Sequence, residues 1–283
     1  MPTAAGIDYR EQGSGRPVVF VHGVGVNGLL WRDVAPRVAK AGYRCISPDL
    51  PMGAHTRPMP PDADLSLPGL AGIVADLLEE LGLEDVVVVA NDTGGAVAQW
   101  LVGHRASRVG ALVLTSCDAW EVFPPKPQLY LIPAARLPGA LWTVGQLVRF
   151  RWVQRTPFAY GWTTREAMPD DVMRSFTTPV RTVPGVRRDL RRLLLAVDKR
   201  YTFEAAEALP SFDKPALVVW GDQDKLFPRE HGERLASLLP QGRFELMPDS
   251  RGFVPMEQPA ALAERIVEFL GAPRAANVHL PTS

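Results

Sequence analysis

The chain has 283 residues, of which 46% are hydrophobic, and its 31 acidic and 31 basic side chains give a formal net charge of zero. This length and composition predict a folded protein with a large core, either one domain of above-average size or one domain with an insertion. A neutral chain exerts no global attraction on nucleic acid or on an anionic membrane, so we expect neither as a partner. The apolar runs are too short to cross a bilayer and the N-terminus lacks a signal-peptide pattern, so we expect a cytoplasmic location.

Apolar runs alternate with segments of helical periodicity along most of the chain. Strands are predicted over residues 18–21, 45–47, 86–90, 109–115, 216–220 and 243–247, and helices over residues 31–41, 67–81, 229–239 and 259–270. This alternation predicts a mostly parallel sheet with helices on both sides. Right-handed crossovers then bring the loops that follow the strands to one common rim.

Residues 119–207 interrupt this pattern. They are rich in Pro, Trp and Arg and, apart from a short stretch at 180–183, contain no run typical of a buried strand. Thirteen basic and five acidic residues fall within 136–200, so charge is segregated even though the whole chain is neutral. We therefore predict a helical cap over the rim, with residues 1–118 and 208–283 forming the core. Its aromatic residues favour either a pocket wall for a ring-containing ligand or simply the core of the cap.

The segment from Asp85 to Gln99 predicts a strand, a sharp turn and a helix. Within it, Ala90-Asn-Asp-Thr-Gly94 places a small residue on either side of a reactive one, which is the nucleophile-elbow pattern with Asp92 where serine is usual. Such a turn raises the central side chain above the sheet. The alternative is that Asp92 merely caps the following helix.

Two further loops of the rim contain histidine. His22 opens the glycine-rich segment 22–28 directly after the first long strand, and His55 lies in the loop after the strand at 45–47. The sequence shows no metal-ligand cluster, phosphate loop or dinucleotide fingerprint, so we expect no cofactor. Cys45 and Cys117 each end a strand-like run, where a small buried thiol without a disulfide is expected.

Three motifs together resemble those of the α/β-hydrolases, and within that superfamily the branch of haloalkane dehalogenases and epoxide hydrolases. They are His22-Gly23 with Trp31-Arg32 nine residues later, the elbow at Asp92, and Trp220-Gly-Asp-Gln-Asp224. The resemblance covers residues 13–118 and 208–270 and implies an α/β-hydrolase fold.

Carried over position by position, the resemblance makes Asp92 the nucleophile. The backbone N–H groups of Val24 and Thr93 would face the reacting group, and His22 and Trp31 would belong to the same oxyanion and binding region. The triad acid would be Asp224 or, as in some dehalogenase-like members, Asp118.

The resemblance fails at the catalytic histidine, because Gly252 stands where the family places it. The residues that commonly bind halide also differ, with Val24 in place of Asn and Thr93 in place of Trp. A carboxylate nucleophile gives an alkyl ester that needs an activated water for hydrolysis, so without a base the enzyme would stall after one turnover.

Three functions therefore remain open. The first is hydrolysis of a small, largely apolar epoxide, haloalkane or ester through Asp92, with His55 as a relocated base. The second is a lyase, cyclase or isomerase in which Asp92 is a general acid or base. The third is a binding-only pseudoenzyme.

Overall fold

A computed structural model describes residues 1–271 of the chain, and residues 272–283, which end the expected core segment, lie outside the described residues. The strands are β1 (Thr3–Ala4), β2 (Ile7–Gln12), β3 (Arg16–Val21), β4 (Tyr43–Pro48), β5 (Val86–Asp92), β6 (Val109–Cys117), β7 (Pro215–Gly221) and β8 (Gln241–Met247). The helices are α1 (Ala35–Lys40), α2 (Leu67–Glu80), α3 (Thr93–His104), α4 (Leu131–Arg136), α5 (Ala140–Leu147), α6 (Arg151–Gln154), α7 (Asp170–Thr182), α8 (Pro184–Leu195), α9 (Lys199–Ala208), α10 (Arg229–Leu238), α11 (Val254–Glu257) and α12 (Pro259–Leu270).

These strands form one eight-stranded sheet in the order β1-β2-β4-β3-β5-β6-β7-β8. All neighbours from β4 to β8 pair in parallel, whereas β1 and β2 pair antiparallel at one edge. The alternation of apolar runs and helices predicted the parallel part, but it did not predict these two edge strands. Their alternating pattern is short, with only Ile7 and Tyr9 supplying large apolar side chains to the core.

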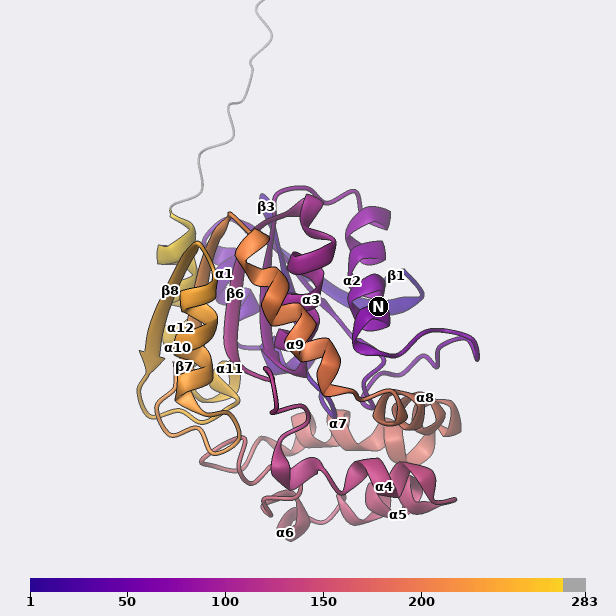
Figure 1. Cartoon of the computed structure of the whole chain (residues 1–283). Coiled ribbons are helices and arrows are strands. Elements are labelled where there is room, and N and C mark those ends of the chain that lie inside the picture. Colours follow the sequence, from indigo (N-terminus) through magenta and orange to yellow (C-terminus); the bar gives the residue numbers. More distant parts are fainter. Residues whose placement is uncertain (272–283) are drawn as a thin grey trace, which may run out of the picture.

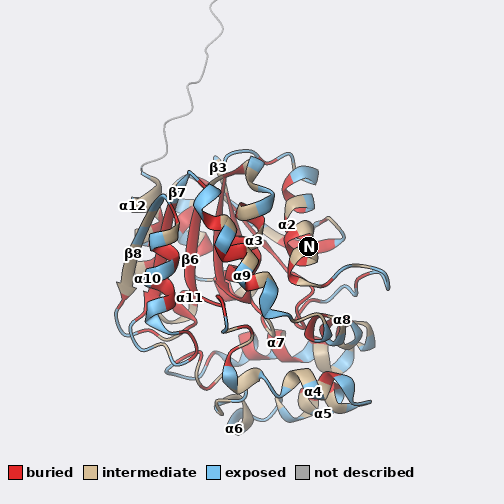
Figure 2. Ribbon diagram, in the orientation of Figure 1, coloured by how far each residue is buried: buried red, intermediate tan, exposed pale blue. Residues whose placement is uncertain are grey.

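Two apolar layers enclose the sheet, as the buried residues in Figure 2 show. Along β5 the side chains alternate, so that Val88 packs in one layer with α2, α3 and α10 while Val87 packs in the other with α1 and α12. Every residue of β5 is buried. This is the environment predicted from its uninterrupted β-branched run.

The segment between β6 and β7 is helical, and in Figure 1 helices α4 to α8 lie together beyond the carboxyl ends of the strands. Residues 180–183, the one possible strand in this segment, belong to the end of α7 and its C-cap. Helix α9, which the sequence analysis assigned to the cap, packs instead against α3, since a Cβ built on Gly103 would lie 2.6 Å from the Cβ of Ala208. The helix expected over 31–41 is shorter, because a 3-10 turn (Gly28–Trp31) precedes α1.

The nucleophile elbow needs glycine at position 94, where the start of α3 packs closely against the end of β3. A Cβ built on Gly94 would lie 2.5 Å from the carbonyl oxygens of both Val21 and His22, and backbone atoms of a central strand have little room to move. We expect Gly94→Ala to lower the free energy of unfolding by about 1–3 kcal/mol through overpacking. Urea denaturation measures this change.

Gly72 provides the matched control, because it lies within α2 and a Cβ there would meet nothing nearer than 3.9 Å. Gly72→Ala should therefore raise the free energy of unfolding by about 0.5–1 kcal/mol, through the lower helix propensity of glycine. Equal effects of the two substitutions would contradict the close packing described for the elbow.

Candidate active site

Asp92 is the last residue of β5 and the N-cap of α3, with φ 56° and ψ −136°. A non-glycine residue in this region costs about 1–3 kcal/mol of backbone strain and persists only where its surroundings hold it. The side chain is buried, and its Oδ1 accepts a hydrogen bond of 2.7 Å from the Thr93 N–H. The structure thus confirms the strained strand-to-helix turn that the elbow pattern predicted.

A second backbone donor comes from the loop after β3. The Val24 N–H is directed at the Asp92 carboxylate, and a Cβ on Gly23 would lie only 2.0 Å from Asp92 Oδ1. Glycine at this position is therefore what lets the loop approach the carboxylate. Burial raises the pKa of Asp92, while the hydrogen bonds from Thr93 and Val24 lower it in part.

His22 holds this loop in place. The Leu50 N–H donates to its Nε2 over 2.8 Å, so the proton of the neutral ring is on Nδ1, which donates to the Gly23 carbonyl oxygen over 2.8 Å. Burial lowers its pKa to about 4. Because the ring is neutral and both nitrogens are engaged, His22 positions the loop and is unsuited to be a catalytic base.

Asp118 lies beside the elbow without contacting an imidazole. Its Oδ2 accepts a 2.7 Å hydrogen bond from the Thr93 hydroxyl, and its backbone carbonyl accepts one from Gln99. The side chain is fully buried, and burial together with the nearby charge of Asp92 raises its pKa well above the ordinary value. Asp118 thus supports Thr93 through Oδ2, while its buried Oδ1 has no hydrogen-bond partner among residues 1–271.

Asp224 occupies the position expected for that acid. Its Oδ1 accepts hydrogen bonds from the Leu226 and Phe227 N–H groups at 2.8 and 3.1 Å, whereas its buried Oδ2 has no hydrogen-bond partner of normal geometry among residues 1–271. Burial raises the pKa of Asp224 to about 6, against the opposing effect of hydrogen bonds, including one from Ser116.

Gly252 faces this carboxylate. A Cβ built on it would lie 3.5 and 3.6 Å from the two Asp224 oxygens and 3.6 Å from the Phe227 ring, which is ordinary van der Waals contact. Its backbone is fixed by a 2.8 Å hydrogen bond from Asn91 to its carbonyl oxygen. The backbone therefore directs a side chain at position 252 toward Asp224, where the resemblance to the hydrolases leads us to expect a histidine and this chain has glycine.

His55 does not replace that imidazole. Its Nδ1 accepts a hydrogen bond from the Gly53 N–H, and its Nε2 lies 3.4 Å from Oδ2 of Asp189 in α8. The side chain is buried and is not among the residues that line the pocket above Asp92. The interpretation of His55 as a relocated base is therefore wrong, because its ring joins the loop to the cap.

The other sequence candidates also lie away from Asp92. Trp31 packs against Phe20 in the core, with ring centroids 5.2 Å apart, so its expected place in the binding region is wrong. The two remaining histidines of the described residues are also remote from Asp92: His104 stacks on Trp100 at the surface, and His231 is buried beside Glu121. Among residues 1–271, no histidine makes a hydrogen bond or ion pair with the Asp92 carboxylate, and these residues contain no cluster suited to a metal ion.

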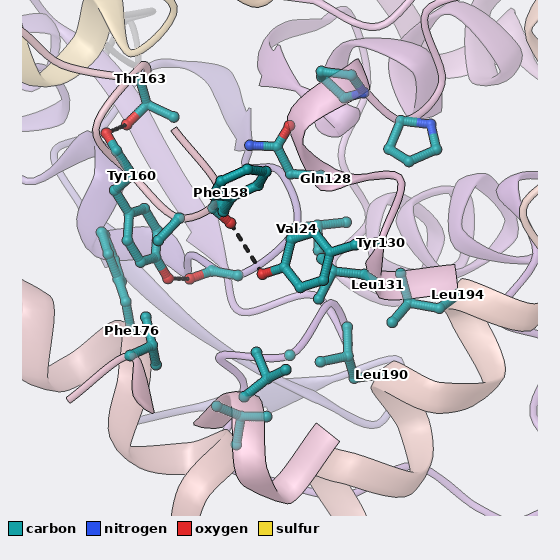
Figure 3. A pocket seen from close by; sticks show the side chains of 18 of the residues that line it. Val24, Gln128, Tyr130, Leu131, Phe158, Tyr160, Thr163, Phe176, Leu190 and Leu194 are labelled. Atoms are coloured by element: carbon teal, nitrogen blue, oxygen red, sulfur yellow. Dashed lines mark hydrogen bonds between the residues drawn. The ribbon is translucent and has the colours of Figure 1, made fainter. Parts of the chain in front are cut away.

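A cavity of about 470 Å³ lies between Asp92 and the cap. Its walls are mainly apolar and come from helices α5, α7 and α8, while Asp92 and Thr93 belong to its floor. Figure 3 shows two phenols among the lining residues: the Tyr160 hydroxyl donates to the Gly25 carbonyl over 2.7 Å, and the Tyr130 hydroxyl donates to the Phe158 carbonyl over 3.0 Å. The volume suits a small organic molecule.

Sequence comparison agrees with this architecture, since a family model described as "Alpha/beta hydrolase family" matches residues 18–265. The chain belongs to the alpha/beta hydrolase family. It is 29% identical over 254 residues to non-heme chloroperoxidase CPO-A1 of Kitasatospora aureofaciens, covering 85% of this chain and 86% of the relative. It is 23% identical over 270 residues to haloalkane dehalogenase 2 of Mycobacterium tuberculosis, covering 94% and 91%.

A solved ancestral haloalkane dehalogenase is similar in fold, with a TM-score of 0.76, 24% identity and coverage of 95% of this chain and 96% of that one. Family membership supports a hydrolase-type activity. Within residues 1–271, no helix combines the length and apolar character needed for a membrane span.

The buried ring of His55 generates a stability prediction. His55→Leu removes the partner of Asp189 Oδ2 and of the Gly53 N–H, so the free energy of unfolding should fall by about 1–3 kcal/mol in urea denaturation. His104→Leu is the control at an exposed site and should change it by less than about 0.5 kcal/mol. An unchanged stability of the His55 variant would mean that the ring does not connect the loop with α8.

Proposed function

We propose that the protein is a hydrolase that opens a small, mainly apolar epoxide with Asp92 as nucleophile. The observation that carries this proposal is the Asp92 carboxylate beneath an apolar cavity with two backbone N–H groups on it. A carboxylate oxygen would attack a ring carbon, the carbon–oxygen bond would break, and an alkyl ester of Asp92 would form. The pocket walls, being apolar, favour such a substrate over a charged one.

The two phenols favour an epoxide over a haloalkane. The departing epoxide oxygen needs a proton, and burial raises the pKa of both Tyr130 and Tyr160, so both hydroxyls stay protonated at neutral pH. Each phenol would exchange the backbone carbonyl to which it now donates for the epoxide oxygen, whereas Thr93 would have to leave a buried carboxyl group. A departing halide needs hydrogen-bond donors near the nucleophile. The Val24 side chain offers none, and the Thr93 hydroxyl already donates to Asp118.

The ester is proposed to be hydrolysed with Asp224 as the base. A water molecule admitted on the Gly252 side would lose its proton to the Asp224 carboxylate and attack the ester carbon of Asp92, once the Asp224 side chain turns to expose Oδ2, which is closed to solvent in this structure. The developing oxyanion would receive the Val24 and Thr93 N–H groups, and its collapse would release the alcohol oxygen, which takes up a proton. A pKa of about 6 brings this carboxyl close to imidazole, whose ordinary pKa is about 6.5.

A trapping experiment with styrene oxide tests both steps. Intact-protein mass spectrometry should show one added molecule, located on Asp92 by peptide mapping, and Asp92→Asn should show none. The adduct should decay faster as pH rises through about 6, because only the ionised form of Asp224 can accept the proton. Asp224→Asn should slow the decay by about a hundredfold to ten-thousandfold, the usual contribution of a general base.

Two further variants complete the design. Gly252→His should speed the decay, because the new imidazole would lie between Asp224 and the ester. Asp222→Asn is the matched control, since this exposed carboxylate accepts a hydrogen bond from the Ser250 N–H and lies outside the proposed chemistry. An adduct whose decay is the same in Asp224→Asn and wild type would refute the role of Asp224.

The raised pKa of Asp92 supports a second candidate, in which it acts as a general acid or base for a non-hydrolytic reaction. Failure of styrene oxide and of other small epoxides to label Asp92, combined with loss of ligand turnover in Asp92→Asn, would favour this second function.

A further inference from the structure

The outer face of the cap is unusually apolar for an exposed surface. Eight of the eleven large hydrophobic side chains that are exposed in residues 1–271 fall between residues 129 and 158. We define the cap face by six of them, Leu137, Trp142, Leu147, Phe150, Trp152 and Phe158. Exposed fractions reach 69% for Trp152 and 63% for Leu137. In Figure 1 helices α5 and α6, which carry Trp142, Leu147 and Trp152, lie at the end of the molecule remote from the sheet.

The same segment is purely basic. Residues 122–164 contain Lys126, Arg136, Arg149, Arg151 and Arg155 and no Asp or Glu. Arg151 pairs with Asp170, and the other four make no ion pair with any residue of the described chain. We expected no membrane partner because the net charge of the whole chain is zero. That zero hides this local excess of positive charge.

The cap face is continuous with the cavity above Asp92. Leu147, Trp152 and Phe158 are exposed to solvent and also line that cavity. The apolar surface therefore runs from the outside of the molecule into the pocket. A ligand that partitions into an apolar phase could follow this surface without crossing water.

Charge decides between the possible occupants of this face. A second copy of the chain would bring two basic, acid-free segments together, which is electrostatically unfavourable. An anionic lipid surface matches the charge, and tryptophan is the side chain that most favours the interface between headgroups and acyl chains. Surface-bound proteins combine these features, an apolar face with flanking Lys and Arg.

We propose that the cap face docks on an anionic lipid surface and presents the mouth of the cavity to it. Trp142, Trp152 and Leu137 enter the interface, while Lys126, Arg136, Arg149 and Arg155 contact the headgroup phosphates. This proposal concerns binding and does not rest on the reaction of Asp92.

Sedimentation with vesicles tests the proposal on the full chain. Vesicles of an equal mixture of phosphatidylcholine and phosphatidylglycerol should bind the protein, and vesicles of phosphatidylcholine alone should bind it much more weakly. Binding should weaken as salt screens the headgroup charge. Arg136→Glu and Arg149→Glu should each reduce the partition coefficient by about fivefold or more, which corresponds to about 1 kcal/mol per basic side chain at an anionic surface.

Apolar contact is tested by Leu137→Ser combined with Trp142→Ser, since neither residue lines the cavity. This double variant should reduce binding several-fold, with an unchanged circular dichroism spectrum and melting temperature as the check on folding. Matched controls are Phe203→Ser on α9, where the side chain is 43% exposed, and Lys214→Glu at the start of β7. Both controls should bind vesicles like wild type.

Three outcomes would overturn the proposal. The first is no binding to either kind of vesicle, or equal binding to both. The second is a loss of binding in the Phe203 and Lys214 variants as large as in the cap-face variants. The third is a dimer in analytical ultracentrifugation that Leu137→Ser with Trp142→Ser dissociates, because the occupant of the face would then be a second copy.

Discussion

The arrangement of this site depends on one strained turn. With φ at 56°, Asp92 leaves β5 and enters α3 within a single residue, so its carboxylate stands at the carboxyl edge of the sheet and the first N–H of the helix points back at it. Gly23 and Gly94 permit the close approach of the loop that supplies the Val24 N–H. Burial beneath the cap then raises the pKa of the carboxyl, and the two N–H groups keep its ionised form accessible.

Three buried carboxyl groups share this edge, and their surroundings give them different roles. Asp92 receives the backbone N–H groups and borders the cavity, Asp118 accepts from the Thr93 hydroxyl, and Asp224 accepts from the Leu226 and Phe227 N–H groups and faces Gly252. Gly252 faces this last carboxyl, whose pKa is raised to about 6 by burial. A water molecule held there by Asp224 would supply the function of the usual histidine at lower efficiency.

Local patterns were sufficient to predict the fold and the elbow. The β-branched run before Asp92 and the small residues after it indicate a buried strand followed by a close-packed helix. The alternation of strands and helices then predicts that the loops after the strands lie on one common rim. The role of His55 could not be predicted, because its partner Asp189 is 134 residues away in sequence. Trp31 was misplaced for the same reason, since burial by distant elements leaves no local signal. The antiparallel strand at residues 7–12 was missed because only Ile7 and Tyr9 mark its buried side.

The most direct test of the central claim is the source of the oxygen in the first turnover. Excess enzyme is mixed with styrene oxide in water enriched in oxygen-18, and product and protein are analysed by mass spectrometry. If Asp92 is the nucleophile, the first diol formed carries no label and oxygen-18 appears in the Asp92 carboxylate, because water attacks the ester carbon. A labelled diol with an unlabelled Asp92 would mean that water attacks the substrate directly, and the account of Asp92 as nucleophile would be wrong.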